Sequence, residues 1–184
     1  RTFSRQFPVP TYVVEFMLGR YCATTDEQEI EEGLEIVQRQ LSSRTVKAGE
    51  EELFKARAYK DGSVKLIDMV SVRFSEKDNG YVATLPSLQL TKVRIPDRIV
   101  DENDRLLTGG FYAEVTLEYD SMIAEEKGGN PFGIFAVKPI QLSKRNVLDV
   151  FSEARSQFST EEWKDILLRS IGLEPSALNE DNKN

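Results

Sequence analysis

Residues 64–74, with the sequence VKLIDMVSVRF, mark the point where the hydrophobic period of the chain changes from helical to alternating. The second half of this stretch predicts a half-buried strand, because apolar and polar residues alternate there. The side chains expected to face inward are Val70, Val72 and Phe74, and those expected to face outward are Ser71 and Arg73. The stretch therefore predicts the first strand of a sheet.

The alternation is broken at Ile67 and Asp68, and this predicts a bulge in a strongly bent first strand. A hairpin turn is expected at residues 77–80, because its Asn-Gly pair suits a positive φ. Two more strands are expected over residues 81–85 and 88–95. The three strands would form a meander.

A helix and two further strands are expected downstream. Pro96 ends the third strand, and the helix would run from Asp97 to Leu107 and end at the Gly109-Gly110 pair. Strands over residues 111–120 and 132–140 would follow, separated by a long polar loop. Three strands, a helix and two strands is the order of an OB-fold, a five-stranded Greek-key barrel. A generic α+β sheet is the alternative, and the helix position and the bent first strand favour the barrel.

Helical periods flank this β region, so the fold class is α+β. Residues 1–58 are expected to form a helical subdomain of three helices, the second of them capped by residues 24–26 with Gln28 as a capping-box partner. Residues 59–142 would form the OB-like barrel. Residues 143–184 would form C-terminal helices, read as a connector towards an AAA+ core that is missing from this chain.

The overall composition bounds the class of protein. The 184 residues include 24 basic and 31 acidic side chains, a net charge of −7, which argues against a protein that coats nucleic acid without specificity. No apolar run approaches the roughly 20 residues that span a bilayer, so we expect no membrane association. Cys22 is the only cysteine, which excludes an internal disulfide and suits a reducing cytoplasm. We expect its thiol to be buried.

Several kinds of catalytic and metal site are missing from the sequence. There is no histidine, the commonest general base near neutral pH and the commonest metal ligand. No phosphate-binding loop and no nucleophile elbow occurs. Acidic pairs such as Glu161-Glu162 are sequence neighbours, so they point in different directions on a helix and indicate a solvated surface. We therefore expect no catalytic residues, no bound metal and no cofactor in this chain.

Several stretches resemble one known family, in that family's own order. They cover roughly residues 8–176: PTYVVEFMLGRYCA at 10–23, EIEEGLE at 29–35, LLTGG at 106–110 with the strand at 115–119, KPIQ at 138–141, and EEWKDILLRSIGLEP at 161–175. This set resembles the N-terminal region of the BrxL family, the Lon-protease-related AAA+ proteins of BREX phage-exclusion systems. No single string encodes a mechanism, and their collinearity carries the resemblance.

The resemblance implies a parent protein that binds DNA, forms a ring by self-association and hydrolyses ATP with Mg²⁺. Its ATPase core and Lon-like portion are expected downstream of this region, and other BREX proteins are possible partners. An N-terminal tier of helices and an OB-type barrel would match this arrangement. The label of an ATP-dependent Lon protease would then refer to chemistry outside these residues.

DNA binding by an OB-like barrel would use strands two and three and the loops after strands one and four. The basic residues expected there are Arg73, Lys77, Lys92, Arg94 and Lys127. Neighbouring acidic residues reduce the positive charge of these loops, so binding of DNA by the isolated domain is expected to be weak. A protein–protein adaptor or substrate-recognition domain is the second hypothesis. A free-standing enzyme is the third.

Overall fold

The computed structural model describes residues 6–125, 130–140, 147–170 and 175. The chain divides into two compact units, residues 1–141 and 142–184, which are described separately. The first unit contains both the N-terminal helices and the sheet.

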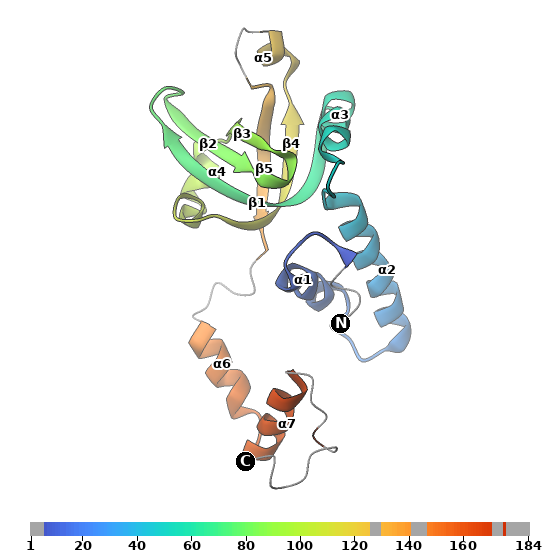
Figure 1. The fold of residues 1–184 in the computed structure, drawn as a ribbon. Coiled ribbons are helices and arrows are strands. Elements are labelled where there is room, and N and C mark those ends of the chain that lie inside the picture. The colour runs from blue at the N-terminus through green and yellow to red at the C-terminus, as the bar shows by residue number, and fades with distance from the viewer. Residues whose placement is uncertain (1–5, 126–129, 141–146, 171–174, 176–184) are drawn as a thin grey trace. The chain divides into compact units, whose positions relative to one another are not determined.

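The sheet is a closed five-stranded barrel, as the order of elements predicts (Figure 1). Its strands are β1 (Ser63–Ser75), β2 (Gly80–Leu85), β3 (Leu90–Arg94), β4 (Phe111–Tyr119) and β5 (Phe132–Pro139), and they neighbour one another in the order β1-β2-β3-β5-β4. Closure comes from β5, which pairs antiparallel with β4 along its length and parallel with β3 at Arg94 and Gly133. The predicted helix before β4 is two short pieces, α4 (Asp97–Asp101) and a 3-10 turn at Asp104–Leu107.

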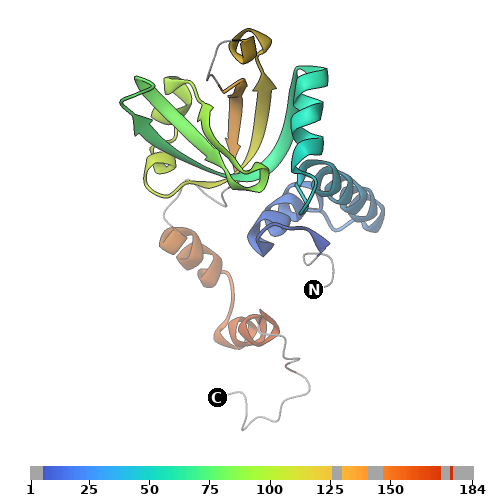
Figure 2. The same cartoon turned by 45° about the horizontal axis from the view of Figure 1, so that its top comes forward.

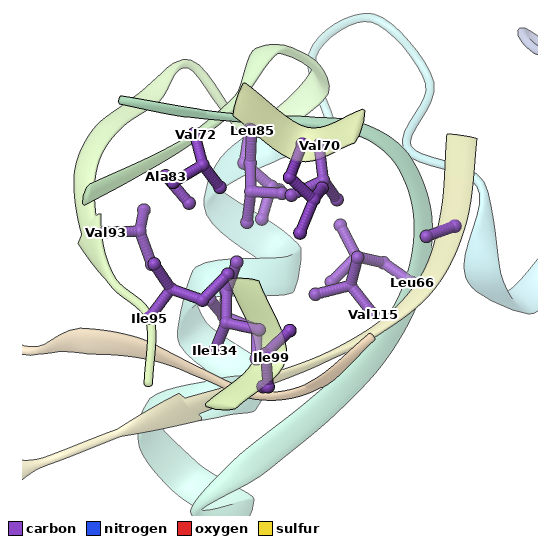
Figure 3. Packing of buried hydrophobic residues seen from close by; sticks show 14 of the residues in the cluster. Leu66, Val70, Val72, Ala83, Leu85, Val93, Ile95, Ile99, Val115 and Ile134 are labelled. Atoms are coloured by element: carbon purple, nitrogen blue, oxygen red, sulfur yellow. The ribbon is translucent and has the colours of Figure 1, made fainter. Parts of the chain in front are cut away.

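Inward-facing aliphatic side chains fill the barrel (Figure 3). Leu66, Val70 and Val72 of β1 meet residues of the other strands and of α4, all of them almost fully buried. The other labelled residues are Ala83, Leu85, Val93, Ile99, Val115 and Ile134 of those elements and Ile95, which directly follows β3. Side chains fill the interior of this barrel, so we look for a binding site on its outer surface.

The predicted bulge in β1 is wrong. The strand pairs with β4 from Ser63 to Val70 and then with β2 from Ser71 to Ser75, without a register shift in either ladder. The alternation breaks because both faces are covered there: Ile67 packs in the core of the N-terminal helices. Phe74 was also expected to face inward, but it is not buried: it lies near the end of the strand and is 57% exposed.

Asp68 is the buried residue that breaks the pattern on the other face. Its carboxylate accepts hydrogen bonds from Ser87 N (3.0 Å), Ser87 Oγ (2.7 Å) and Met69 N (2.8 Å). These bonds tie β1 to the 3-10 turn at Pro86–Leu88, which joins β2 to β3. Burial raises the pKa of this carboxyl above its ordinary value, against the opposing effect of the three bonds.

Three helices precede the barrel and lie along one side of it (Figures 1 and 2). They are α1 (Thr11–Tyr21), α2 (Glu27–Arg44) and α3 (Glu51–Asp61). Helices α1 and α2 share a core that joins Val13, Val14, Met17, Val37 and Leu41 to Ile67 and Ile140 of the barrel region, whereas Phe54 of α3 packs in the barrel core. Asp26 caps α2 by accepting from Glu29 N, whereas the predicted partner Gln28 bonds to Glu32.

The contact between helices α1 and α2 depends on Gly33. A Cβ at this position would lie 2.8 Å from Cys22 Sγ, so the end of α1 could not approach α2 as it does. Cys22 itself is half-buried at the end of α1, not fully buried as predicted.

The second unit contains α6 (Val147–Ser156) and α7 (Thr160–Ser170). The Trp163 ring packs edge-on against Phe151, with centroids 5.4 Å apart, and lies 6.0 Å from Phe158. Ser159 caps α7, since Ser159 N donates to the Glu162 carboxylate and Glu162 N donates to Ser159 Oγ. No residue of α7 is buried. Of the helices described, none has the length and apolar character to cross a membrane.

Candidate nucleic-acid interface

Two of the predicted cations lie in one row across neighbouring strands. Arg73 of β1 is paired with Val82 of β2, which is paired in turn with Arg94 of β3. Residues in register share a face of a sheet, and two strand spacings separate their Cα atoms by about 10 Å. Since Val72 and Ala83 point into the barrel, this row faces outward. The structure therefore brings Arg73 and Arg94 to one outer face.

Arg73 and Lys77 lie on the β1–β2 hairpin, and both are exposed. Asn79 adopts φ +48° in the turn, as its Asn-Gly sequence predicts. Asp78 accepts a hydrogen bond from the Ser75 hydroxyl, so one of the two nearby carboxylates is engaged within the hairpin. Among the described residues neither Arg73 nor Lys77 has a carboxylate partner.

Arg94 has a more acidic environment than the sequence suggests. Its Nη2 lies 3.7 Å from Asp120 Oδ2. Gly133 makes room for this arrangement, because a Cβ there would lie 3.2 Å from Glu118 Oε1 and 3.3 Å from Arg94 Nη2. Asp120 thus stands close to the guanidinium, with Glu118 on the same side of Gly133, and Arg94 is a weaker anion contact than its position in the row implies.

Lys92 is exposed and lies in a β-bulge of β3. Val93 pairs with Ala83 and Leu90 with Leu85, so Thr91 and Lys92 together stand opposite Thr84 alone. Lys92 adopts φ +58°. Lys127, the fifth predicted cation, lies outside the described residues.

Asn130 is a contributor that the sequence did not reveal. Its Nδ2 donates to Thr91 O (3.1 Å) and Lys92 O (3.2 Å), and its Oδ1 accepts from Phe132 N (3.0 Å). The side chain joins the end of the β4–β5 loop to the bulge of β3. Nearly forty residues separate the partners, so no local pattern could have signalled the contact.

The outer face of β4 near Glu114 is committed to the N-terminal helices. Glu114 receives Arg44 of α2 at 2.7 Å and Arg20 of α1 at 3.2 Å. Tyr112 beside it makes an edge-on contact with Tyr12 of α1. Neither this face nor the candidate interface contains a metal site: within the described ranges, no three His, Cys, Asp or Glu side chains are grouped to hold an ion.

Two family models match the chain. The model described as BREX system Lon protease-like protein BrxL N-terminal matches residues 1–119, and the model described as Lon-like protease BrxL-like, ATPase domain matches residues 132–184. The boundary between them falls in the β4–β5 loop, so β5 belongs to the barrel in space and to the ATPase model in sequence. The match to the ATPase-domain model thus begins inside this chain, at the first residue of β5.

Two curated relatives bear the name Lon-like protease BrxL. The protein from Escherichia coli O9:H4 (strain HS) is 38% identical over 175 residues, which is 95% of this chain and 25% of the relative. The protein from Bacillus cereus (strain H3081.97) is 41% identical over 170 residues, 92% of this chain and 25% of the relative. The chain therefore spans about a quarter of the length of these relatives.

Proposed function

Because the chain belongs to the BrxL family of BREX-system Lon-like proteins, we propose that it is a non-catalytic DNA-binding and assembly module of a larger AAA+ protein. That parent protein would hydrolyse ATP with Mg²⁺, self-associate in a ring, and act in phage defence in the cytoplasm with other BREX proteins. The barrel of this chain would contact DNA, and the bond-making steps would take place elsewhere in the polypeptide.

The observation that carries this proposal is a set of exposed cations on β1, on the β1–β2 hairpin and on β3. Arg73 on β1, Lys77 in the hairpin and Lys92 on β3 have no carboxylate partner among the described residues. On the other side of the barrel, Arg20 and Arg44 of the helices hold Glu114, and Lys65 and Lys138 beside it are exposed cations as well. Exposed cations that are free to pair with phosphates are what a backbone-contacting DNA surface requires.

We expect the isolated chain to bind DNA weakly and in a salt-sensitive way. Few phosphates are neutralised by three or four cations, and each one contributes about 0.9 to the slope of log affinity against log salt on duplex DNA. A net charge of −7 adds a repulsive background. Assembly of several copies would raise the affinity through multivalency.

The test is fluorescence anisotropy of a labelled oligonucleotide titrated with the chain at several salt concentrations. The double variant Arg73→Glu/Lys92→Glu should lose most of the binding and flatten the salt slope. Arg94→Glu is avoided, since it would place a third carboxylate beside Glu118 and Asp120. The matched control Arg39→Glu/Lys60→Glu makes the same charge change on α2 and α3 and should bind nearly as the native chain does. An equal loss in both variants would show that net charge alone decides binding, and would remove the proposed interface.

A protein-binding role is the second candidate, and one observation favours it. Leu34, Leu53 and Tyr59 on the outer surfaces of α2 and α3 are 38%, 47% and 67% exposed. Exposed apolar groups on neighbouring helices suit a protein partner. A partner that is captured after nuclease treatment, and lost in Leu53→Glu/Tyr59→Glu, would favour an adaptor or substrate-recognition domain. Retention of such a partner by Arg73→Glu/Lys92→Glu would separate the two roles.

A further inference from the structure

Lys92 has a backbone conformation that a lysine rarely adopts. Its φ of +58° lies in the left-handed region, where the Cβ of an L-residue is crowded by its own backbone. Glycine or asparagine is the usual choice at such a position, and glycine is the usual residue in a bulge with this geometry. The local backbone conformation therefore gives no reason for a lysine at this position.

Packing does not compensate for this conformation either. The side chain of Lys92 is exposed, and it has no ion-pair partner in the described part of the chain. Strained residues persist where the surrounding structure holds them, and they are concentrated at functional sites. An exposed, unpaired cation held in this way is a candidate for contact with an external anion.

Asn130 is what holds the bulge. Its Nδ2 donates to the carbonyl oxygens of Thr91 and Lys92, the two residues that form the bulge. The bond that it accepts from Phe132 N fixes the same side chain to the start of β5. The direction of Lys92 is thus set by a residue of the β4–β5 loop.

We propose that the bulge of β3, clamped by Asn130, is a phosphate-binding point that aims the Lys92 ammonium at the sugar–phosphate backbone of a nucleic acid. This inference rests on the proposed function and deepens it. The ligand is recognised as a polyanionic backbone, irrespective of base sequence. A single flexible ammonium group cannot make the paired hydrogen bonds by which a side chain distinguishes one base edge from another. Asn130 is a positioning residue and does not touch the ligand.

The first test separates the binding role of Lys92 from its cost to the fold. Lys92→Gly should raise the melting temperature, since glycine adopts this backbone freely, and should weaken DNA binding severalfold with a salt slope lower by about 0.9. Lys92→Arg keeps both the charge and the strained backbone and should bind as the native chain does. Gln89→Gly is the matched control: Gln89 also has a positive φ, +54°, in the neighbouring turn, and its replacement should raise the melting temperature and leave binding unchanged.

The second test asks whether Asn130 acts through Lys92. Asn130→Ala should weaken binding, and the double variant Lys92→Gly/Asn130→Ala should bind no more weakly than Lys92→Gly alone. Such non-additivity is the signature of two residues that act as one unit. A purely structural role of Asn130 would lower the melting temperature and give additive effects on affinity, which would overturn its assignment.

The outcomes distinguish this inference from the function on which it rests. If the native chain binds DNA and Arg73→Glu weakens binding while Lys92→Gly does not, the interface stands and the bulge is not its phosphate contact. If the native chain shows no salt-dependent DNA binding, the proposed function fails and this inference fails with it. Oligonucleotides of unrelated sequence should compete equally, and a strong preference among them would contradict recognition of the backbone.

Discussion

At the scale of single residues, Asp68 is a carboxyl group whose charge is unfavourable for the fold. It is 1% exposed, and it satisfies its oxygens with two donors from Ser87 and one from Met69. Its sequence position marked it as an exception in an apolar strand. Its partner Ser87, nineteen residues away in the 3-10 turn between β2 and β3, could not be read from the sequence.

The raised pKa of Asp68 predicts how stability depends on pH. Between the pKa of the unfolded chain and the higher pKa of the folded protein, the folded state binds more protons, so the free energy of unfolding should decrease as pH rises through this window. Each unit of difference between the two pKa values corresponds to about 1.4 kcal/mol. The measurement is urea unfolding of the native chain and of Asp68→Asn between mildly acidic and neutral pH.

The native chain should gain stability relative to Asp68→Asn as the pH is lowered towards the ordinary pKa of aspartate. Asparagine cannot accept all three bonds, because either orientation of its amide sets the NH₂ group against a backbone N–H, so the variant should be less stable by about 1–3 kcal/mol at the acidic end. A stability difference that stays constant or grows with rising pH would contradict the burial effect.

At the scale of elements, hydrophobic periodicity was sufficient to predict the order of the strands, but it did not predict which elements pack on each strand. The alternation in residues 111–120 correctly predicts β4, and Tyr112 is its one apolar residue on the polar face because α1 packs there through Tyr12. The same cause explains the failure at Ile67, since a strand covered on both faces loses its alternation without any bulge. The bulges that exist lie in the β2–β3 and β4–β5 ladders, where the sequence shows no break.

The dependence of the barrel on β5 predicts the effect of truncation. A chain of residues 1–131 would leave β3 and β4 with unpaired edges and would lose the buried side chain of Ile134 together with those of Phe132 and Val137, which pack on the core. The lost burial amounts to about 5 kcal/mol, comparable with the whole net stability of a small domain. We expect this chain to aggregate or to show no cooperative thermal transition by circular dichroism.

Residues 1–141 are the matched control for this truncation, because they retain β5 and lack only the second unit. They should melt cooperatively, close to the transition of the full chain. A cooperative transition at the same temperature in residues 1–131 would show that β5 is dispensable and that the closed barrel is not the stable form.

At the scale of the whole molecule, the sequence predicted the class, the five-stranded barrel and the family. The binding surface was predicted less well, because strand register and ion pairing decide which cations are available. Arg73 was correctly expected to face outward, but the engagement of Arg94 by Asp120 depends on how the start of the β4–β5 loop returns to β3. Residue types alone cannot show this.

The two units should differ in stability. The chain has one tryptophan, Trp163, and it lies in the second unit, where α7 has no buried residue. Its fluorescence should therefore change at low urea in a shallow transition, while circular dichroism, dominated by residues 1–141, changes later and more steeply. Coincident curves from the two probes would show that the units unfold together.

The position of β5 also bears on how these proteins can exchange parts by recombination. A crossover in the β4–β5 loop, where the two family models meet, would give the offspring four strands from one parent and the closing strand from the other. In such a hybrid, Ile134 of one parent would have to pack against core side chains of the other parent. A joint placed after Pro139 transfers the barrel intact. Substitutions in β5 should therefore be selected together with those in the strands it packs against, more than with those in the rest of the segment that matches the ATPase model.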